Sequence, residues 1–150
     1  MENHRDDFCV IMVGYKDDME TMLTGNLGLK SRIPFSVDFP NYSRAELEKI
    51  FFSMLEGNFD YERALRGAAK DFFAKIPDEE LNAKDFSNAR FVRNLYERVW
   101  GKAAYRQSLH ADEPLRILAS DLAGAAEDRE FKHLLSDRAA DRHVIGFGIH

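Results

Sequence analysis

The first residues whose chemistry stands out are two cations, Lys30 and Arg32, in the stretch LGLKSRIPFSVDFP at positions 27–40. They lie in a glycine-containing loop just before an apolar segment that ends at Pro40. A solvated loop needs no such arrangement, so the question is what the guanidinium of Arg32 contacts. The alternative is a surface arginine in a polar loop, which is how most arginines occur.

A third cation, Arg90, lies at the expected start of a helix, where Ser87 or Asn88 is the candidate N-cap. A positive charge at this end of a helix opposes the helix dipole. The position therefore hints at an anionic partner such as phosphate. The alternative is an arginine that pairs with Asp85 or Glu97 in the same region.

Other reactive side chains give no site. Cys9 lies in an apolar run without an electropositive neighbour, so we expect a small buried core residue. The carboxylates of residues 78–80 fit a solvated turn, and no nucleophile–base pair is recognisable. The histidines lack metal-ligand spacing and are expected to be solvated: His4, His110, His133, His143 and His150.

Composition narrows the function classes. The net charge of -5 argues against a nucleic-acid binder, which is normally basic. One cysteine provides no disulfide framework, and no apolar run approaches the roughly 18 residues of a membrane span. The N-terminus MENHRDDF is too polar for a signal peptide. We therefore expect a cytoplasmic protein with no membrane and no nucleic-acid partner.

The first third of the chain predicts two strands around a short helix. Residues 8–15, FCVIMVGY, form an apolar run typical of a strand buried on both faces. Residues 34–39, PFSVDF, alternate apolar and polar side chains. Residues 16–23 place Met19, Met22 and Leu23 on one helical side. Because unpaired strand edges are normally covered, we expect the strands to pair with each other or with a second copy.

The remainder predicts helices. Ser43 and Glu46 have capping-box spacing, and Asp60 is the expected N-cap of a second helix. A third, longer helix should run to about Gln107, and Ser120 is expected to cap a shorter one. One turn is expected at residues 78–81, and a further amphipathic turn or two carries Phe131, Leu134 and Leu135. The inward faces of the first three helices are Leu47, Ile50, Phe51, Met54 and Leu55; Ala64, Leu65, Ala68, Ala69, Phe72 and Phe73; and Phe91, Val92, Leu95, Tyr96 and Val99.

These elements and residues resemble the C-terminal half of an AAA+ ATPase. The resemblance is carried by VIMVGYKDDMETML, NLGLKSRIPFSVDFPNYSRAELEKIF and FSNARFVRNLYERV, over roughly residues 8–106, with a weaker similarity in the closing ADRHVIGFGIH. The nearest subgroup is that of the stage V sporulation protein K-like proteins and the red-type rubisco activase. The specific signal is the combination of a strand ending in Gly-Tyr, the Gly-x-x-Ser-Arg loop, Asp-Phe-Pro and Asn-Ala-Arg.

The resemblance implies a role for several residues. Arg32 matches the arginine finger, which reaches the γ-phosphate of ATP in a neighbouring subunit, where a planar permanent cation can stabilise developing charge. Arg90 matches the sensor-2 arginine of the lid, and Arg93 lies one turn further along the same face. Tyr15 stands at the sensor-1 position, where asparagine or threonine is commoner. Lys30 replaces the usual arginine and keeps only its charge.

The resemblance also shows what these 150 residues lack. They contain no Gly-x-x-x-x-Gly-Lys-Ser/Thr loop and no apolar strand ending in Asp-Glu before Phe8, so neither Walker A nor Walker B is present. Leu27 stands where the subgroup usually has proline. We expect ATP and magnesium to act in a full-length protein, with no cofactor and no hydrolysis for this chain alone. Met1 is expected to be an internal start or a truncation point.

The sequence thus predicts a mainly α fold. Residues 1–41 would be the last two strands of an AAA+ α/β core, and residues 42–150 an all-α lid with a C-terminal extension. The implied function is the sensor, finger and lid portion of a ring-forming ATPase, hexameric by resemblance, that remodels a protein substrate. The alternative is a free-standing, non-enzymatic helical module that binds other proteins.

Overall fold

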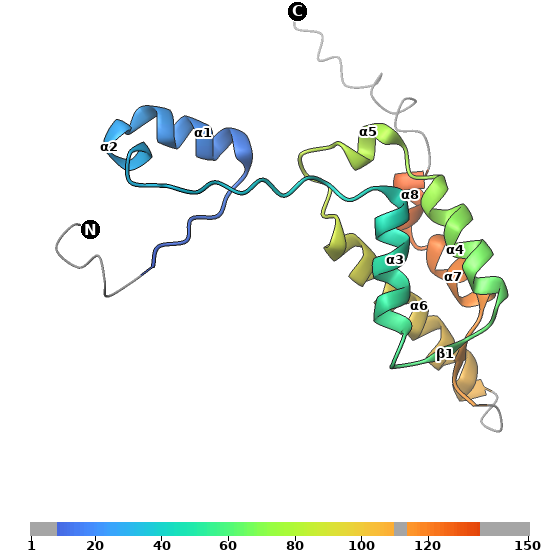
Figure 1. The fold of residues 1–150 in the computed structure, drawn as a ribbon. Coiled ribbons are helices and arrows are strands. Elements are labelled where there is room, and N and C mark those ends of the chain that lie inside the picture. Colours follow the sequence, from blue (N-terminus) through green and yellow to red (C-terminus); the bar gives the residue numbers. More distant parts are fainter. Residues whose placement is uncertain (1–8, 110–113, 136–150) are drawn as a thin grey trace, which may run out of the picture. The chain divides into compact units, whose positions relative to one another are not determined.

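The computed structural model describes residues 9–109 and 114–135 and divides the chain into two compact units, Met1–Pro40 and Asn41–His150. Each unit is described by itself (Figure 1). The mainly helical fold predicted from the sequence is confirmed. The elements in chain order are α1 (Lys16–Gly25), α2 (Leu27–Lys30), α3 (Arg44–Leu55), β1 (Asp60–Tyr61), α4 (Ala64–Ala74), α5 (Asp78–Leu81), α6 (Ala89–Leu109), β2 (Arg116–Ile117), α7 (Ala119–Ala126) and α8 (Arg129–Leu135).

The first unit consists of α1, α2 and two extended flanking segments. The predicted helical face is confirmed, since Met19, Met22 and Leu23 are half-buried, as is Leu29 of α2. The short α2 was not predicted. It forms because the side chain of Asn26 accepts a hydrogen bond from the backbone N–H of Leu29 at 3.0 Å, which caps its first turn.

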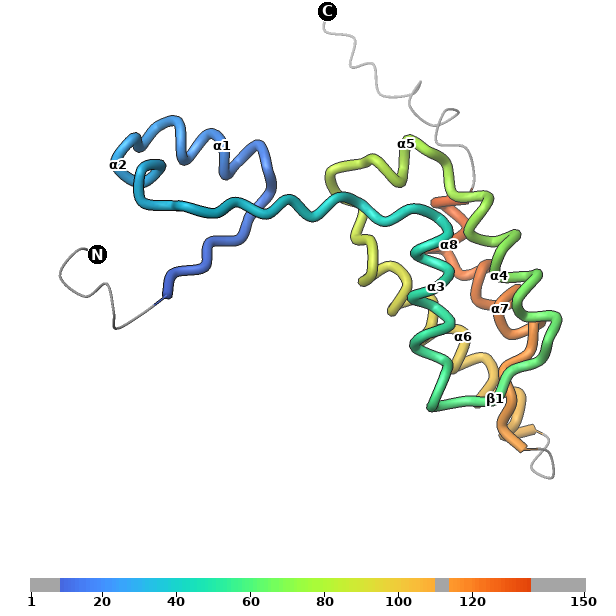
Figure 2. The backbone as a smooth tube through the Cα atoms, viewed as in Figure 1, coloured from blue at the N-terminus to red at the C-terminus, as the bar shows by residue number. Residues whose placement is uncertain are grey.

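The two strands predicted in this unit are not formed. Residues 9–15 and 33–40 are extended, as Figure 2 traces, but no ladder hydrogen bond joins them within the described chain. The expectation that they pair with each other is therefore wrong. Their apolar side chains have no sheet to pack against: Val13 is 91% and Phe35 85% exposed. Cys9, expected in a core, is exposed for the same reason.

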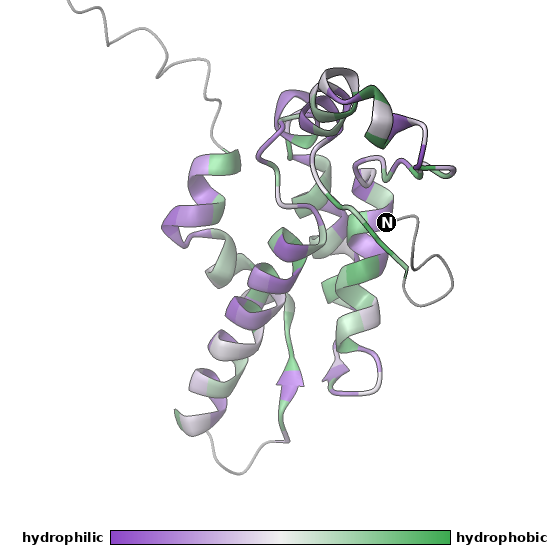
Figure 3. Ribbon diagram, turned by 90° about the vertical axis from the view of Figure 1, so that its left-hand side faces the viewer, coloured by the Kyte–Doolittle hydropathy of each residue, from purple (hydrophilic) through white to green (hydrophobic). Residues whose placement is uncertain are grey.

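The second unit is built on four neighbouring helices. Among the described residues, α6 lies beside both α3 and α7, while α4 lies beside α3 and α7 (Figure 1). Each of these four helices, and also α8, contributes side chains to a single hydrophobic core. The hydropathy colouring in Figure 3 shows apolar and polar residues alternating along the helices. The largest fully buried side chains are Leu47, Phe51, Leu55, Leu65, Phe73, Ile76, Val92, Leu95, Val99, Ile117 and Phe131.

Helix α3 begins as its sequence predicts. The side chain of Ser43 accepts from the backbone N–H of Glu46, and the Glu46 carboxylate accepts from the backbone N–H of Ser43 at 2.9 Å. This reciprocal capping box satisfies donors that a helix end leaves unpaired. At the other end, Gly57 follows the helix with a φ of 90°, a conformation that glycine adopts readily.

Two helix starts differ from prediction because of a small parallel ladder. Asp60 pairs with Arg116 and Tyr61 with Ile117, so Asp60 belongs to β1 and α4 begins only at Ala64. Ser120 does not cap α7. The helix begins at Ala119, two residues earlier than a Ser120 cap implies, and the Asp121 carboxylate accepts the backbone N–H of the N-cap residue Leu118 at 2.8 Å.

Candidate functional site

Arg32 lies directly after α2, on a turn formed by its own backbone. Its N–H donates to the carbonyl of Leu29, and its Nη1 donates to the carbonyl of Gly28 at 3.1 Å. The side chain is exposed. A Cβ placed on Gly28 would lie 3.4 Å from Arg32 Nη1, an ordinary van der Waals distance, so the guanidinium lies close against this turn. The predicted loop is thus a one-turn helix that presents Arg32 at its end.

Arg90 is the second residue of α6, and its side chain is exposed. Its backbone N–H bonds to the carbonyl of Ser87 at 2.9 Å. Within residues 9–109 and 114–135 its guanidinium has no hydrogen bond or ion pair, so the alternative of pairing with Asp85 or Glu97 is not realised there. An anion nearby would offset the unfavourable interaction between a permanent cation and the positive end of a helix dipole.

The other predicted positions are accessible as well. Arg93 is exposed one turn after Arg90 on α6. Tyr15 is the N-cap residue of α1 and is 61% exposed, and its carbonyl accepts the N–H of Met19. Arg32 and Tyr15 belong to the first unit, whereas Arg90 and Arg93 belong to the second.

The start of α6 is fixed by a hydrogen-bond cluster that sequence reasoning missed. Asn88 has a φ of 48°, in the left-handed region, and its carboxamide oxygen accepts the backbone N–H of Tyr42 at 3.0 Å. Its Nδ2 donates to Asn41 Oδ1 at 2.9 Å and to the carbonyl of Phe86 at 3.1 Å. Asn41 in turn donates to the carbonyl of Leu81. The Asn-Ala-Arg motif predicted where the helix begins, but nothing in the sequence indicated that Asn88 would bond to residues 41 and 42.

The first residues of α3 lie beside this cluster. An open pocket of about 430 Å³ is lined by Leu81, Asn82 and residues 41–46. Arg44 donates from Nε and Nη2 to the carbonyl of Ile76, and its Nη1 lies 2.7 Å from Asp78 Oδ1. Hydrogen bonds from the backbone and hydroxyl of Ser43 lower the pKa of the Glu46 carboxyl below its ordinary value.

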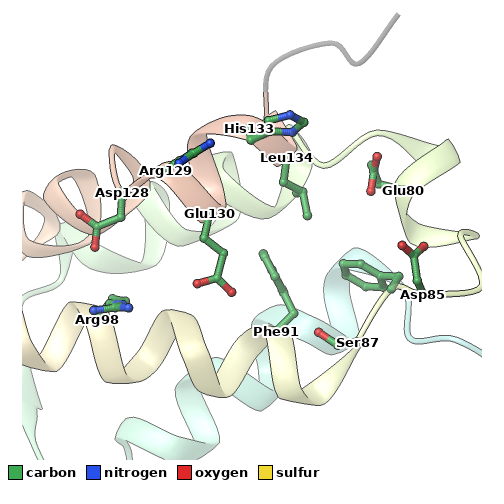
Figure 4. Close-up of a pocket in the computed structure, with 11 residues that line it drawn as sticks. Glu80, Asp85, Ser87, Phe91, Arg98, Asp128, Arg129, Glu130, His133 and Leu134 are labelled. Atoms are coloured by element: carbon green, nitrogen blue, oxygen red, sulfur yellow. The ribbon is translucent and has the colours of Figure 1, made fainter. Parts of the chain in front are cut away.

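A larger open pocket of about 820 Å³ lies between α6, α8 and the segment before α6. In Figure 4, Glu130 of α8 and Phe91 of α6 point into it, with Asp85 and Glu80 at one end and Arg98 and Asp128 at the other. Asn94 Nδ2 donates to Glu130 Oε1 at 3.0 Å. The sequence did not indicate this pocket because its charged residues come from three separate segments. Arg90 is not among its lining residues.

The described residues contain neither a candidate metal site nor a helix suited to cross a membrane. In the ranges 9–109 and 114–135, no group of three or more histidine, cysteine or carboxylate side chains could hold a metal ion. Over the same ranges, none of the helices has the length and apolar character needed to cross a membrane. The closing motif ADRHVIGFGIH and four of the five histidines, His133 being the exception, lie outside the described residues.

A family model and several known proteins match this chain, and they point to the same protein family. Residues 43–133 match the AAA lid domain. The chain is 35% identical over 144 residues to the plasmid-encoded protein CbxX of Cupriavidus necator, covering 95% of this chain and 41% of that protein. It is 37% identical over 114 residues to protein CfxQ of Xanthobacter flavus, covering 75% of this chain and 33% of that protein.

A third relative carries a more explicit name. The chain is 37% identical over 106 residues to the chloroplastic ribulose bisphosphate carboxylase/oxygenase activase of Cyanidioschyzon merolae, covering 71% of this chain and 35% of that protein. The chain thus spans less than half the length of each of these relatives. The matched region is the C-terminal part of those proteins, as the sequence resemblance predicted.

Proposed function

Because the chain belongs to the AAA lid domain family and its relatives are AAA+ ATPases, we propose that it is the sensor, arginine-finger and lid portion of an ATP-driven protein-remodelling ATPase. The observation that carries the proposal is Arg90, an exposed cation in the first turn of α6 without a partner among the described residues. Such a residue can contact the phosphates of a nucleotide and report whether the γ-phosphate is present.

Arg32 supplies the second proposed contact. Its guanidinium lies at the end of α2, exposed, with Nη1 bonded to the carbonyl of Gly28. A guanidinium carries five N–H donors in a planar fork whose geometry suits phosphate oxygens. In this role Arg32 acts on ATP bound by a neighbouring subunit. Tyr15, exposed at the start of α1, is the corresponding proposal for the sensor-1 position.

Nucleotide and partners follow from the same proposal. ATP and magnesium would be held by a phosphate loop and an Asp-Glu strand, neither of which occurs in these 150 residues. Hydrolysis therefore takes place only where those elements are supplied to this chain, in a ring that resemblance makes hexameric. The substrate is a protein, and one relative is named as an activase of ribulose bisphosphate carboxylase/oxygenase.

A chimera tests both arginines. Residues 9–150 replace the matching C-terminal part of CbxX from Cupriavidus necator, and ATP turnover and nucleotide affinity are measured. Arg32→Ala should lower turnover by about a thousandfold or more while nucleotide affinity stays, because an arginine finger acts in the transition state. Arg90→Ala should weaken ATP binding by about tenfold or more and reduce the distinction between ATP and ADP.

The matched control is Arg63→Ala, because Arg63 is an exposed arginine just before α4 with no side-chain partner among the described residues. Its chimera should keep turnover and affinity. An Arg32→Ala chimera as active as the unsubstituted one would remove the finger role. Equal effects of Arg90→Ala and Arg63→Ala on ATP affinity would remove the sensor role.

A second candidate, a helical module that binds other proteins without enzymatic activity, is favoured by one observation. Among residues 9–109 and 114–135, the nineteen buried apolar residues of the core all lie within positions 47–131, in the second unit. Such a unit can fold and bind on its own. Under this candidate, excess chain added to intact CbxX lowers its ATPase activity, and Arg32→Ala and Arg90→Ala leave that inhibition unchanged.

A further inference from the structure

Asn88 is the residue before α6, and its side chain does not cap the helix that it precedes. The carbonyl of Asn88 accepts the N–H of Val92 at 3.2 Å, which places Asn88 at the N-cap position. An N-cap asparagine ordinarily accepts from an N–H two or three residues further along the helix. Here the carboxamide oxygen accepts instead from Tyr42, 46 positions away in the sequence. The side chain is used to connect two segments.

The connected segment is residues 41–43, which lead into α3; we call it the lead-in segment. It is held at three points. The Tyr42 N–H donates to the carboxamide oxygen of Asn88, and Nδ2 of the same carboxamide donates to Asn41 Oδ1. Asn41 Nδ2 donates to the carbonyl of Leu81 at 2.9 Å. The lead-in segment is therefore attached to the end of α5 and to the start of α6 at once.

The backbone conformation of Asn88 and its hydrogen bonds to the lead-in segment both suit an asparagine at this position. Its φ of 48° lies in the left-handed region, which asparagine tolerates better than most residues other than glycine. In that conformation the carboxamide makes three hydrogen bonds, with Nδ2 also bonded to the carbonyl of Phe86. Asparagine is suited to both requirements, because it offers an acceptor and two donors on a short side chain.

We propose that Asn88 is a positioning residue that holds the first turn of α6, and with it Arg90, at a fixed place relative to the lead-in segment. Arg90 follows Asn88 by two residues, and its backbone N–H is bonded to Ser87 within the same turn. A change in the direction of the lead-in segment is thereby transmitted to the base of the Arg90 side chain. The value of this coupling for nucleotide sensing rests on the function proposed above for Arg90.

The test uses nuclear magnetic resonance on the 150-residue chain. Asn88→Gly keeps the left-handed backbone accessible and removes the carboxamide. The Tyr42 N–H should then exchange with solvent at least about tenfold faster, because its acceptor is gone. The order parameter of the Arg90 amide should fall in the same sample. The Ser43 N–H is an internal control, since it bonds to Glu46 and not to Asn88, so its exchange should not change.

Two further variants separate the parts of the proposal. Asn88→Asp keeps the oxygen that accepts from Tyr42 but places an oxygen where Nδ2 faced Asn41 Oδ1, so Tyr42 protection should persist while the Asn41 side-chain amide resonances shift. Asn82→Gly is the matched control, because Asn82 Nδ2 bonds only locally, to the carbonyl of Asp78. It should leave Tyr42 and Arg90 unchanged. Protection of the Leu95 and Val99 amides verifies that each variant is folded.

The outcomes are decisive either way. Unchanged Tyr42 exchange in Asn88→Gly would overturn the connection, and unchanged Arg90 order alongside faster Tyr42 exchange would overturn the positioning role. If Asn82→Gly perturbs Tyr42 as strongly as Asn88→Gly does, the effect is general loosening and the proposal fails. None of these readouts involves a nucleotide, so their failure is distinct from a failure of Arg90→Ala to affect ATP binding in the chimera.

Discussion

Arg106 and Asp121 form a two-point ion pair at the junction of α6 and α7. Arg106 Nε lies 3.1 Å from Asp121 Oδ1, and Nη2 lies 3.0 Å from Oδ2. The Asp121 side chain is only 4% exposed, and the same carboxylate accepts the backbone N–H of Leu118. Arg106 Nη2 also donates to the carbonyl of Arg116 in β2. One buried carboxylate thus ties together α6, α7 and the small ladder.

Removing one partner of this pair should strongly destabilise the second unit. Asp121→Ala leaves the Arg106 guanidinium without its carboxylate and α7 without its cap, and we expect a loss of about 3–5 kcal/mol in the free energy of unfolding. Urea denaturation followed by circular dichroism measures it. Lys132→Ala is the control, because the Lys132–Glu127 pair is exposed on both sides, so the same measurement should hardly change. Similar losses in the two variants would contradict the assignment.

The capping box of α3 should make stability depend on pH. The pKa of Glu46 is lowered by its hydrogen bonds to Ser43, so the carboxylate form is favoured in the folded state. A group with a lowered folded pKa contributes stability above its unfolded value, here about 4.5, and loses it as the pH falls through the folded pKa. Thermal unfolding from pH 7 to pH 3 should therefore show a drop in stability that is smaller in Glu46→Gln.

The control for this measurement is Glu48→Gln, on the same helix, because the half-buried Glu48 makes no hydrogen bond or ion pair within the described residues. Its pH profile should follow that of the unsubstituted chain. A Glu46→Gln profile that also coincides with the unsubstituted one would show that the capping box adds nothing to the pH dependence.

The packing of helix α8 should depend strongly on Phe131. Phe131 is fully buried and contacts the rings of Phe72 at 6.3 Å and Phe91 at 5.6 Å between centroids. Phe131→Ala should destabilise the unit by about 3–5 kcal/mol, since it removes a large buried ring and leaves a cavity. Phe131→Leu should cost less because it retains most of the apolar volume. Guanidinium denaturation of the two variants checks the order, and equal losses would contradict it.

The sequence predicted the second unit well where local signals coincide with burial. Helix α3 combines the Ser43–Glu46 capping box with an apolar face, and α6 follows Asn88 with an apolar residue on every turn. The one-turn α5 and the apolar face of α8 were also predicted correctly. In these helices the core buries most of the periodic apolar residues, and the rest are partly buried against it.

The misses have physical causes as well. A two-residue ladder such as β1–β2 is too short to show periodicity, so Asp60 resembled an N-cap. The apolar segments 9–15 and 33–40 have strand patterns, but a strand needs a neighbour to accept its hydrogen bonds, and no ladder forms among the described residues. For the candidate site, the sequence indicated Arg32 and Arg90 but not Asn41, because contacts over 47 positions leave no local pattern.

Two glycines should respond in opposite directions to alanine. Gly57 has a φ of 90°, and a Cβ there would meet no atom within 4 Å, so Gly57→Ala should destabilise by about 1 kcal/mol through backbone strain alone. Gly67 lies inside α4, and a Cβ there also meets nothing within 4 Å, so Gly67→Ala should stabilise by about 0.5–1 kcal/mol. Thermal denaturation of both variants measures the difference. Since the Gly57→Ala methyl group touches no other residue, a stabilising shift in this variant would show that the backbone conformation at Gly57, and with it the end of α3, is not the one described.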